Sequence, residues 1–306
     1  MKKNFISQYF SLIIILAALI GIFFPSMFRS FGGVIPYLLA LIMFSVGLHI
    51  NISDFKYVVN LRYKIFIILF LKISCTAYLA YLIGKFLGLN LLELVGLVIV
   101  GTCPGGTAAS VMALLSRANV TLAVCLTMIT TILTPITMPL IIYSLFHESV
   151  ELDWLGMAQT TFTIVIIPIA LGLLVKKKNI FGPNALDIFT NIAIIAITLI
   201  VMIIVALNYN IILALPVKLI LSVIILSILA SFIGYIVGVM FNLDTASRKA
   251  LLFEFSILDV GLGIVIATIF FGKEAAIAGV FYAVWQNIVG PIIANLLINK
   301  KGDKRK

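Results

Sequence analysis

The chain has 306 residues, of which 63% are hydrophobic and only 10% are charged, and its mean hydropathy is +1.27. A water-soluble domain could not keep so much apolar surface away from water, so the composition indicates a polytopic membrane protein with the lipid bilayer as a partner. The formal net charge of +10 does not indicate a nucleic-acid partner, because the basic residues are distributed as in a membrane protein.

Ten apolar runs are long enough to be transmembrane helices, which need roughly 20 residues each. In chain order, the predicted spans are 8–28, 33–51, 63–87, 91–115, 119–145, 154–175, 183–208, 215–241, 248–271 and 274–299. Short connections between them leave no room for a soluble domain. The first run resembles a signal peptide, but it is long and lacks a small-residue cleavage site, so we interpret it as a retained span.

The basic residues predict the orientation of the chain. Sixteen of the 21 Lys and Arg residues fall on the side of the two termini, four fall on the other side, and Lys72 lies inside a span. Because cytoplasmic loops carry the excess of Lys and Arg, both termini are predicted to be cytoplasmic, with the protein in the inner (plasma) membrane. We interpret residues 301–306 as a basic cytoplasmic tail.

The acidic loop 147–153 divides the spans into two halves of five, residues 1–146 and 154–300. Since each half has an odd number of spans, the second half must enter the membrane in the opposite sense, and inverted repeats of this kind are common in secondary transporters. The predicted fold is therefore an all-α polytopic membrane protein with ten transmembrane helices in two inverted five-helix repeats.

The fourth span of each half contains a feature that interrupts a helix. In the first half, the residues CPGG (103–106) lie near the middle of span 91–115, where proline removes a backbone donor and glycine favours unwound chain. The corresponding span 248–271 contains two acids followed by two glycines. Interrupted segments at corresponding positions indicate a binding site near the middle of the bilayer. The alternative is a proline kink that serves packing alone.

A broken helix exposes free N–H groups at the beginning of its second half and free C=O groups at the end of its first half. The N–H groups suit an anion and the C=O groups suit a cation. Gly105, Gly106, Thr107 and Ala108 follow the proline, and we predict that their amides bind an anionic substrate.

Glu254 and Asp259 are the only acids away from the ends of the predicted spans, where an ionisable residue is costly. On a regular helix they would point roughly 140° apart, but both face one cavity if the helix unwinds between them. We predict that they take part in coupling-ion or substrate binding. The alternative is that each is a structural acid bonded between helices.

Lys72 is the only basic residue deep within a span, away from its ends, and at this depth it needs an acidic partner or else loses its proton. The hypothesis is a lysine–carboxylate pair with Glu254 or Asp259, and the alternative is that Lys72 extends to the membrane interface. Gln286 and Asn287 are polar at membrane depth, and they either line the cavity or bridge helices.

Nothing in the sequence indicates an enzyme. It contains no HExxH or GxSxG motif, and its three cysteines all fall within spans, so neither a disulfide framework nor a metal cluster is indicated. We therefore expect no enzymatic activity and no cofactor, with Na⁺ or H⁺ as the coupling ion of a transporter.

The run GTCPGGTAASVMALLSRANVTLAVCLT (101–127) resembles the fourth and fifth spans of the bile acid:sodium symporter family, and CPGG is its most specific signal. LALIMFSVGLHINISDF (39–55) resembles the second span, and LLFEFSILDVGLG (251–263) and WQN (285–287) fall where other family motifs lie. The likeness is to a bacterial member of the family. It implies a core domain of spans 3–5 and 8–10, whose broken spans 4 and 9 cross, and a panel domain of spans 1, 2, 6 and 7. It also implies transport of an organic anion, from bile acids to small pantoate-like carboxylates, usually with sodium.

The resemblance implies two sodium sites, and this chain departs from both. The first would fall on Ala109, Ser110, Ala123, Thr127 and Glu254, of which only Thr127 and Glu254 match the family. The second would involve Glu254, the backbone near Phe255 and Ile257, and two glutamine positions that are Leu258 and Lys72 here. Because a hard cation needs several oxygen ligands, these sodium sites are degenerate.

Our hypothesis is that Lys72 stands in for the second sodium ion. Transport would then be proton-coupled or sodium-independent, and Asp259 would balance Lys72 or accept the proton. The alternatives are sodium-coupled symport, as the family resemblance implies, and cation/proton antiport.

Overall fold

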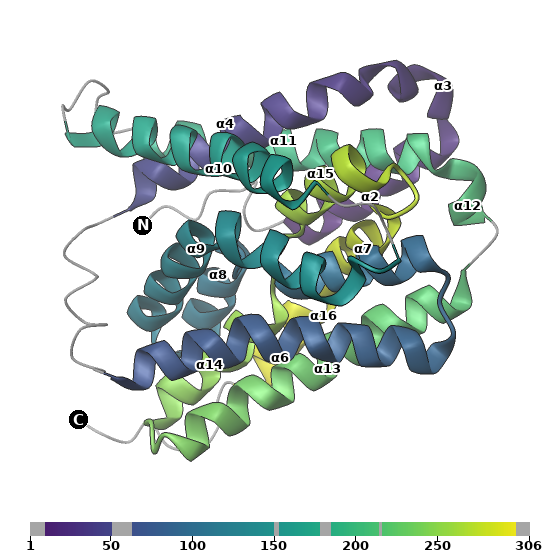
Figure 1. Cartoon of the computed structure of the whole chain (residues 1–306). Helices are drawn as coiled ribbons and strands as arrows, with labels where there is room; N and C mark the ends of the chain where they lie inside the picture. The colour runs from purple at the N-terminus through teal and green to yellow at the C-terminus, as the bar shows by residue number, and fades with distance from the viewer. Residues whose placement is uncertain (1–9, 51–62, 150–152, 178–184, 214–215, 298–306) are drawn as a thin grey trace.

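The computed structural model describes residues 10–50, 63–149, 153–177, 185–213 and 216–297 (Figure 1). Across these residues the chain is helical, and the only β-pairing among them is one isolated bridge. In chain order, the helices are α2 (Phe10–Phe23), α3 (Pro25–Phe28), the 3₁₀ helix η1 (Arg29–Val34), α4 (Ile35–His49), α6 (Tyr63–Leu87), α7 (Leu91–Thr102), α8 (Thr107–Leu115), α9 (Val120–Phe146), α10 (Trp154–Lys177), α11 (Ala185–Leu207), α12 (Tyr209–Leu213), α13 (Val217–Met240), α14 (Thr245–Ser256), α15 (Val260–Phe271) and α16 (Ile277–Leu297).

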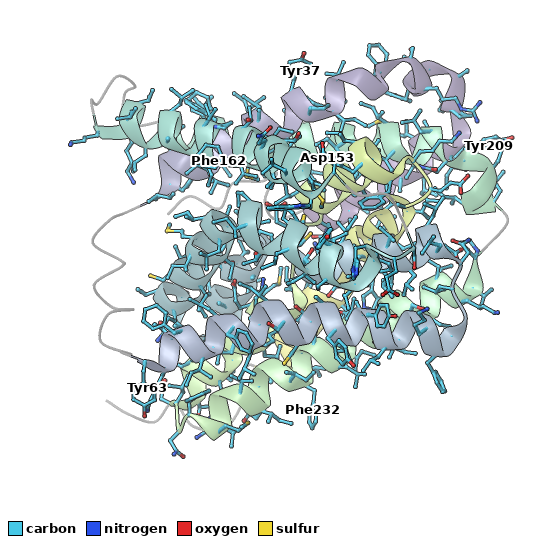
Figure 2. The ribbon with its side chains drawn as sticks, viewed as in Figure 1. Tyr37, Tyr63, Asp153, Phe162, Tyr209 and Phe232 are labelled. Atoms are coloured by element: carbon cyan, nitrogen blue, oxygen red, sulfur yellow. The ribbon has the colours of Figure 1, made fainter. Side chains whose placement is uncertain are left out.

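Seven helical segments among the described residues are long and apolar enough to cross a membrane. Two further apolar helices, α7 and α15, are shorter, because each belongs to a span that is broken in its middle. Large apolar side chains such as Tyr37, Phe162 and Phe232 point outward from the helices (Figure 2), and each is more than half exposed. The prediction of an all-α polytopic membrane protein is therefore confirmed, while the count of ten spans in two inverted repeats stays a prediction.

The helices pack as two groups (Figure 1). The first group comprises α2, α4, α10 and α11, and the second comprises α6 to α9 and α13 to α16. In the first group, α4 and α10 come into backbone contact at glycines: a Cβ atom added to Gly47 would lie 2.2 Å from the carbonyl oxygen of Ile169, and one added to Gly172 would lie 2.3 Å from that of Phe44. The groups also pack against each other, above all through α9 and α10, so the predicted division into panel and core domains stays a prediction.

Side-chain caps set where the helices of the second group begin. Asn90 and Glu93 form a reciprocal capping box at the beginning of α7, with nitrogen-to-oxygen distances of 2.9 and 3.1 Å. Asp244 accepts a hydrogen bond from the amide of Ser247 and starts α14 at Thr245, earlier than the predicted residue 248. With their starts fixed in this way, both broken spans have their interruption near the middle. The predicted cytoplasmic tail, residues 301–306, lies outside the described residues.

Candidate functional site

The two broken helices cross at their breaks. Residues 103–106 separate α7 from α8, and residues 257–259 separate α14 from α15. Gly105 and Leu258 form an antiparallel bridge, the amide of Gly106 donates to the carbonyl of Ile257 at 2.8 Å, and the amide of Asp259 donates to that of Pro104 at 2.9 Å. Each break thus supplies hydrogen-bond partners to backbone groups of the other. Non-helical chain inside a membrane is tolerated only when its backbone groups have such partners.

The glycines of CPGG are required by the closeness of this crossing. A Cβ atom added to Gly105 would lie 1.9 Å from Oε1 of Glu254, and one added to Gly106 would lie 2.9 Å from the carbonyl oxygen of Leu258. On the opposite segment, a Cβ atom on Gly263 would lie 2.6 Å from Sγ of Cys103. The chain does unwind between Glu254 and Asp259, and the break precedes the glycines of α15.

Gln286 of α16 holds the second break from another side. Its Oε1 accepts from the amide of Leu258 at 2.9 Å, and its Nε2 donates to the carbonyl of the same residue at 3.0 Å. Both residues are buried. Of the two interpretations offered for Gln286, the structure supports a bridge between helices. Asn287 is also buried, and its Nδ2 donates to the carbonyl of Ala283 at 2.7 Å within α16.

The amides of residues 105–108 form the predicted anion-binding site, which we call the anion seat. Fewer of these amides are free than the sequence indicated. The amide of Gly106 is engaged by Ile257, and the amide of Gly105 points to Oγ1 of Thr130 at 3.4 Å. Among the described residues, no acceptor is found for the amides of Thr107 and Ala108, the first two of α8. The side chain of Thr107 is exposed, and no side chain caps this helix end. The open amides of the crossing are therefore those of Thr107 and Ala108.

Lys72 lies at the carbonyl end of α7. Only 2% of the residue is exposed, and its Nζ donates to the carbonyl of Cys103 at 2.8 Å. One turn along α6, the hydroxyl of Thr76 donates to the carbonyl of Gly101 at 2.6 Å. The alternative that Lys72 extends to the interface is wrong. Its ammonium group is not within 4.0 Å of a carboxylate oxygen of Glu254 or Asp259, although both acids interact with it electrostatically. The direct partner of Lys72 is thus a helix carbonyl and not an acid, because the break leaves that carbonyl free.

The two acids have different surroundings. Glu254 is fully buried: its Oε2 accepts from the hydroxyl of Thr127 at 2.8 Å, and its Oε1 has no hydrogen-bond partner. Asp259 is half-buried at the beginning of α15, where its carboxylate lies beside the amides of Gly261 and Leu262 without forming a capping hydrogen bond. Glu254 therefore faces Gly105 at the crossing, and Asp259 is the less buried of the two acids.

The positions of the degenerate sodium sites offer few oxygen atoms. Ala109, Ala123 and Leu258 are buried apolar residues, and Ser110 is half-buried on α8. Only Thr127 makes a hydrogen bond to Glu254. Within the described ranges, no group of three or more His, Cys, Asp or Glu residues could hold a metal ion. The side chains present thus supply fewer oxygen ligands than a sodium ion prefers.

Three hydroxyl groups that were not predicted from the sequence take part in the crossing. Thr76 and Thr130 contact the first break, and Tyr282 donates to the carbonyl of Ser256 at 2.9 Å at the end of α14. In an apolar helix, a threonine usually bonds the carbonyl four residues earlier, so its type alone gives no signal.

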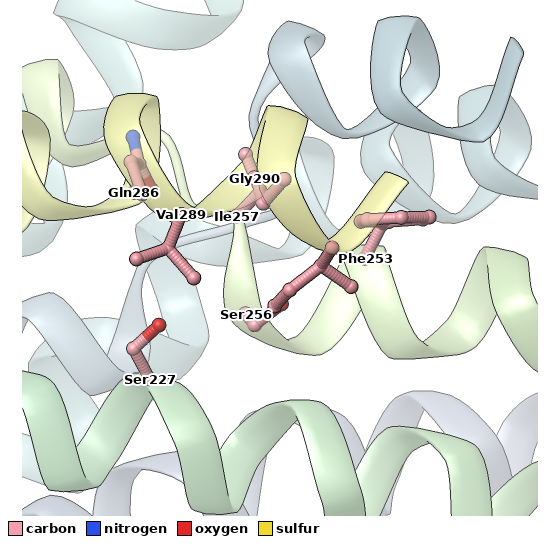
Figure 3. Close-up of a pocket in the computed structure, with 8 residues that line it drawn as sticks. Ser227, Phe253, Ser256, Ile257, Gln286, Val289 and Gly290 are labelled. Carbon is pink, nitrogen blue, oxygen red and sulfur yellow. The ribbon is translucent and has the colours of Figure 1, made fainter. Parts of the chain in front are cut away.

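A small cavity lies beside the second break, lined by residues of α13, α14 and α16 (Figure 3). Ser227 of α13, Ser256 of α14 and Gln286 of α16 supply its polar lining, and the remaining lining residues are Phe253, Ile257, Val289, Gly290 and Ile293. It has room for about one water molecule, which is too little for an organic substrate. This cavity is therefore not a substrate site.

Helices that break and cross in the middle of a polytopic membrane protein are the arrangement of secondary transporters. The fold and the crossing thus define a membrane transport protein. The chain belongs to the sodium bile acid symporter family, because the model described as "Sodium Bile acid symporter family" matches residues 36–215. This match confirms the resemblance drawn from the sequence.

Relatives in bacteria, plants and animals carry transporter names. The chain is 30% identical to the Bacillus subtilis protein "Uncharacterized sodium-dependent transporter YocS", covering 99% of this chain and 95% of the relative. It is 26% identical to the Arabidopsis thaliana protein "Probable sodium/metabolite cotransporter BASS1, chloroplastic", over 95% of this chain and 73% of that one. It is 27% identical to the human "Ileal sodium/bile acid cotransporter", over 53% of this chain and 47% of the relative.

Proposed function

We propose that the protein is a secondary active transporter that moves an organic anion across the plasma membrane by alternating access. The observation that carries this proposal is the open amide end of α8 at the crossing of the two broken helices. The family and the names of the relatives, which refer to sodium, metabolites and bile acid, support the same class of activity.

The substrate would bind through its negative charge. The free amides of Thr107 and Ala108 begin a nine-residue helix, so they combine hydrogen-bond donors with the positive end of the helix dipole. Small residues on either side, Gly106 and Ala109, leave the backbone accessible. A carboxylate is the anion that this seat suits, and no fixed cationic side chain is needed to hold it.

The two helix groups are the moving parts in this proposal. The first group would act as the panel domain and the second as the core domain, with the crossing inside the core and the two groups rocking against each other. Ten spans in inverted repeats, and both termini in the cytoplasm, complete the proposed topology.

Lys72 would replace a bound cation. Its ammonium group is fixed at the carbonyl end of α7, where a free ion would otherwise compensate the helix dipole. We propose that transport therefore does not need this sodium ion. A proton would be the coupling ion instead, and it would bind to the unpartnered oxygen of Glu254. Strict sodium coupling, as the names of the relatives describe for them, is the competing mechanism.

Uptake into proteoliposomes tests the proposal. A set of radiolabelled carboxylates, from pantoate to cholate, would be offered under an inward sodium gradient, under a proton gradient in choline chloride, and with neither. We expect uptake of at least one carboxylate in choline that the proton gradient increases. Uptake that needs sodium and ignores the pH gradient would contradict the role of Lys72. Dissipation of a pH gradient by Na⁺ or K⁺ with no organic substrate present would instead favour a cation/proton antiporter.

A further inference from the structure

We propose that the turn between α13 and α14, residues 241–244, is a binding site for the head group of an anionic phospholipid. Lys64 at the beginning of α6 and Arg248 in α14 supply its positive charge, because both side chains bond to carbonyl groups of this turn. The inference goes beyond the proposed function and does not depend on which substrate the protein transports.

The two cations meet at the turn through hydrogen bonds. Nζ of Lys64 donates to the carbonyl of Phe241 at 3.1 Å, and Nε of Arg248 donates to the carbonyl of Leu243 at 2.6 Å. Phe241 and Leu243 are two residues apart, so the chain between them spans at most about 7 Å. Both positive groups therefore lie at one short piece of chain, as a head group that contacts both of them requires.

The positive charge of this pair is not compensated by the protein around it. Ammonium and guanidinium groups have several N–H donors, and each of these two makes one hydrogen bond, to a neutral carbonyl oxygen. Within the part of the chain that the structure describes, neither forms an ion pair with an acid within 4.0 Å. Asp244, the acid of the turn, is exposed and accepts from the amide of Ser247. Lys64 and Arg248 are half-buried, so their remaining donors are accessible to an anionic ligand.

The surface next to the pair is apolar and faces outward. Helices α6 and α13 lie side by side (Figure 1), and Tyr63 of α6 and Phe232 of α13 point to the same side of the molecule (Figure 2). Phe66 and Phe70 of α6 and Met240 of α13 are also more than half exposed. Exposed apolar side chains beside two cations at a helix end suit the acyl chains and the head group of one lipid.

An anionic phospholipid is the ligand that uses both features. A free phosphate ion would contact the cations alone, and a phosphatidylcholine carries its own positive charge beside its phosphate. The predicted orientation places this turn on the cytoplasmic side, and basic pockets between transmembrane helices on that side bind anionic head groups. The lipid would thus link the beginning of α6 to the beginning of α14.

Thermal unfolding of the full chain in a neutral detergent tests this site. Phosphatidylglycerol would be compared with phosphatidylcholine of the same acyl chains, by the lipid concentration that gives half of the maximal shift in melting temperature. We expect phosphatidylglycerol to act at a concentration about tenfold or more lower, because each Lys or Arg beside an anionic head group contributes about fivefold. The double variant Lys64→Gln/Arg248→Gln should reduce this ratio about tenfold.

The matched control is Lys85→Gln/Lys218→Gln, which removes two exposed lysines from α6 and α13 at the opposite ends of these helices. It should leave the ratio of the two lipids unchanged. The exchange Lys64→Arg/Arg248→Lys keeps both charges and should keep most of the ratio. If Lys64→Gln/Arg248→Gln does not fold, each substitution is measured alone, and each should reduce the ratio about fivefold.

The inference fails if the two lipids act equally on the unmodified chain, or if removing the charges of Lys64 and Arg248 leaves the ratio unchanged. It also fails if the control variant loses as much of the ratio, because the preference would then not be located at this turn. Inorganic phosphate, added alone at constant ionic strength, should produce no shift. A shift as large as that of phosphatidylglycerol would make the turn a site for free anions and not for a lipid.

Discussion

At both breaks, backbone groups of one segment bond to the other segment, but the polar side chains around the two breaks differ in charge. At the first break, a cation and a hydroxyl group, Lys72 and Thr76, close the carbonyl end of α7, and the amide end of α8 stays open. At the second break, neutral side chains on α16 close the carbonyl end, while an acid, Asp259, begins α15. The comparison teaches that the first break suits a negative group and the second supplies negative charge, although the chain path is alike in both.

The largest effect is expected from Gly105→Ala, which tests whether the two breaks depend on contact with each other. The new methyl group would overlap the carboxylate of Glu254, and because this side chain is fully buried, it could turn away only by disturbing its surroundings and losing its hydrogen bond to Thr127. We expect loss of the folded protein, or a destabilisation of about 3 kcal/mol or more, measured by thermal unfolding in detergent. Gly33→Ala is the control, because a Cβ atom there meets nothing within 4 Å. Equal stability of the two variants would contradict the described crossing.

Lys72→Gln removes the positive charge at the carbonyl end of α7, at the first break. An uncharged amide keeps a donor for the carbonyl of Cys103 but leaves two carboxylates with no cation. Removing one partner of a buried charged group costs about 3–5 kcal/mol, and an added cation should recover part of that loss. We expect transport by this variant to become dependent on sodium.

The control for Lys72→Gln is Lys218→Gln, an exposed lysine at the beginning of α13. Sodium concentration would be varied at constant ionic strength, and both uptake and melting temperature would be followed. If the Lys72 variant ignores sodium in both measurements, the lysine does not occupy the place of an ion.

A smaller effect is expected at the neutral end of the second break. Gln286→Leu would leave the buried N–H and C=O groups of Leu258 without their partner, at about 1–3 kcal/mol for each group. Tyr282→Phe removes one hydrogen bond and should cost about 1 kcal/mol. Thermal unfolding would rank the variants, with exposed Tyr37→Phe as the control. A larger loss for Tyr282→Phe than for Gln286→Leu would contradict the bridging role of Gln286.

The sequence was enough to predict the class of fold and the existence of both breaks. CPGG in the middle of an apolar run is incompatible with a continuous helix, and two acids in another run indicate a site there. The exact place of the second break was not predictable, because it is set by pairing with residues 104–106, which lie far away in the chain. The glycines that follow Asp259 are helical in α15 and do not form the break.

The partners of polar groups were predicted less well than their presence. Lys72 was expected to bind an acid, but the nearest acceptor is a carbonyl that only the folded crossing exposes. Four amides were expected to form the anion seat, yet two of them are engaged by Ile257 and Thr130. Charge and residue type thus identify which groups matter, while the three-dimensional crossing decides which remain free.

Replacing Thr107 by proline tests whether the open amides of α8 bind the anion. Thr107 is the first residue of the helix and Gly106 before it has extended backbone, so proline fits there and removes one N–H group. Thr107→Ala keeps that N–H group and serves as the matched variant. We predict that Thr107→Pro weakens binding of the transported carboxylate about tenfold or more, whereas Thr107→Ala stays near the unmodified protein. Equal affinity of the two variants, with both folded, would show that the N–H group of residue 107 does not bind the anion.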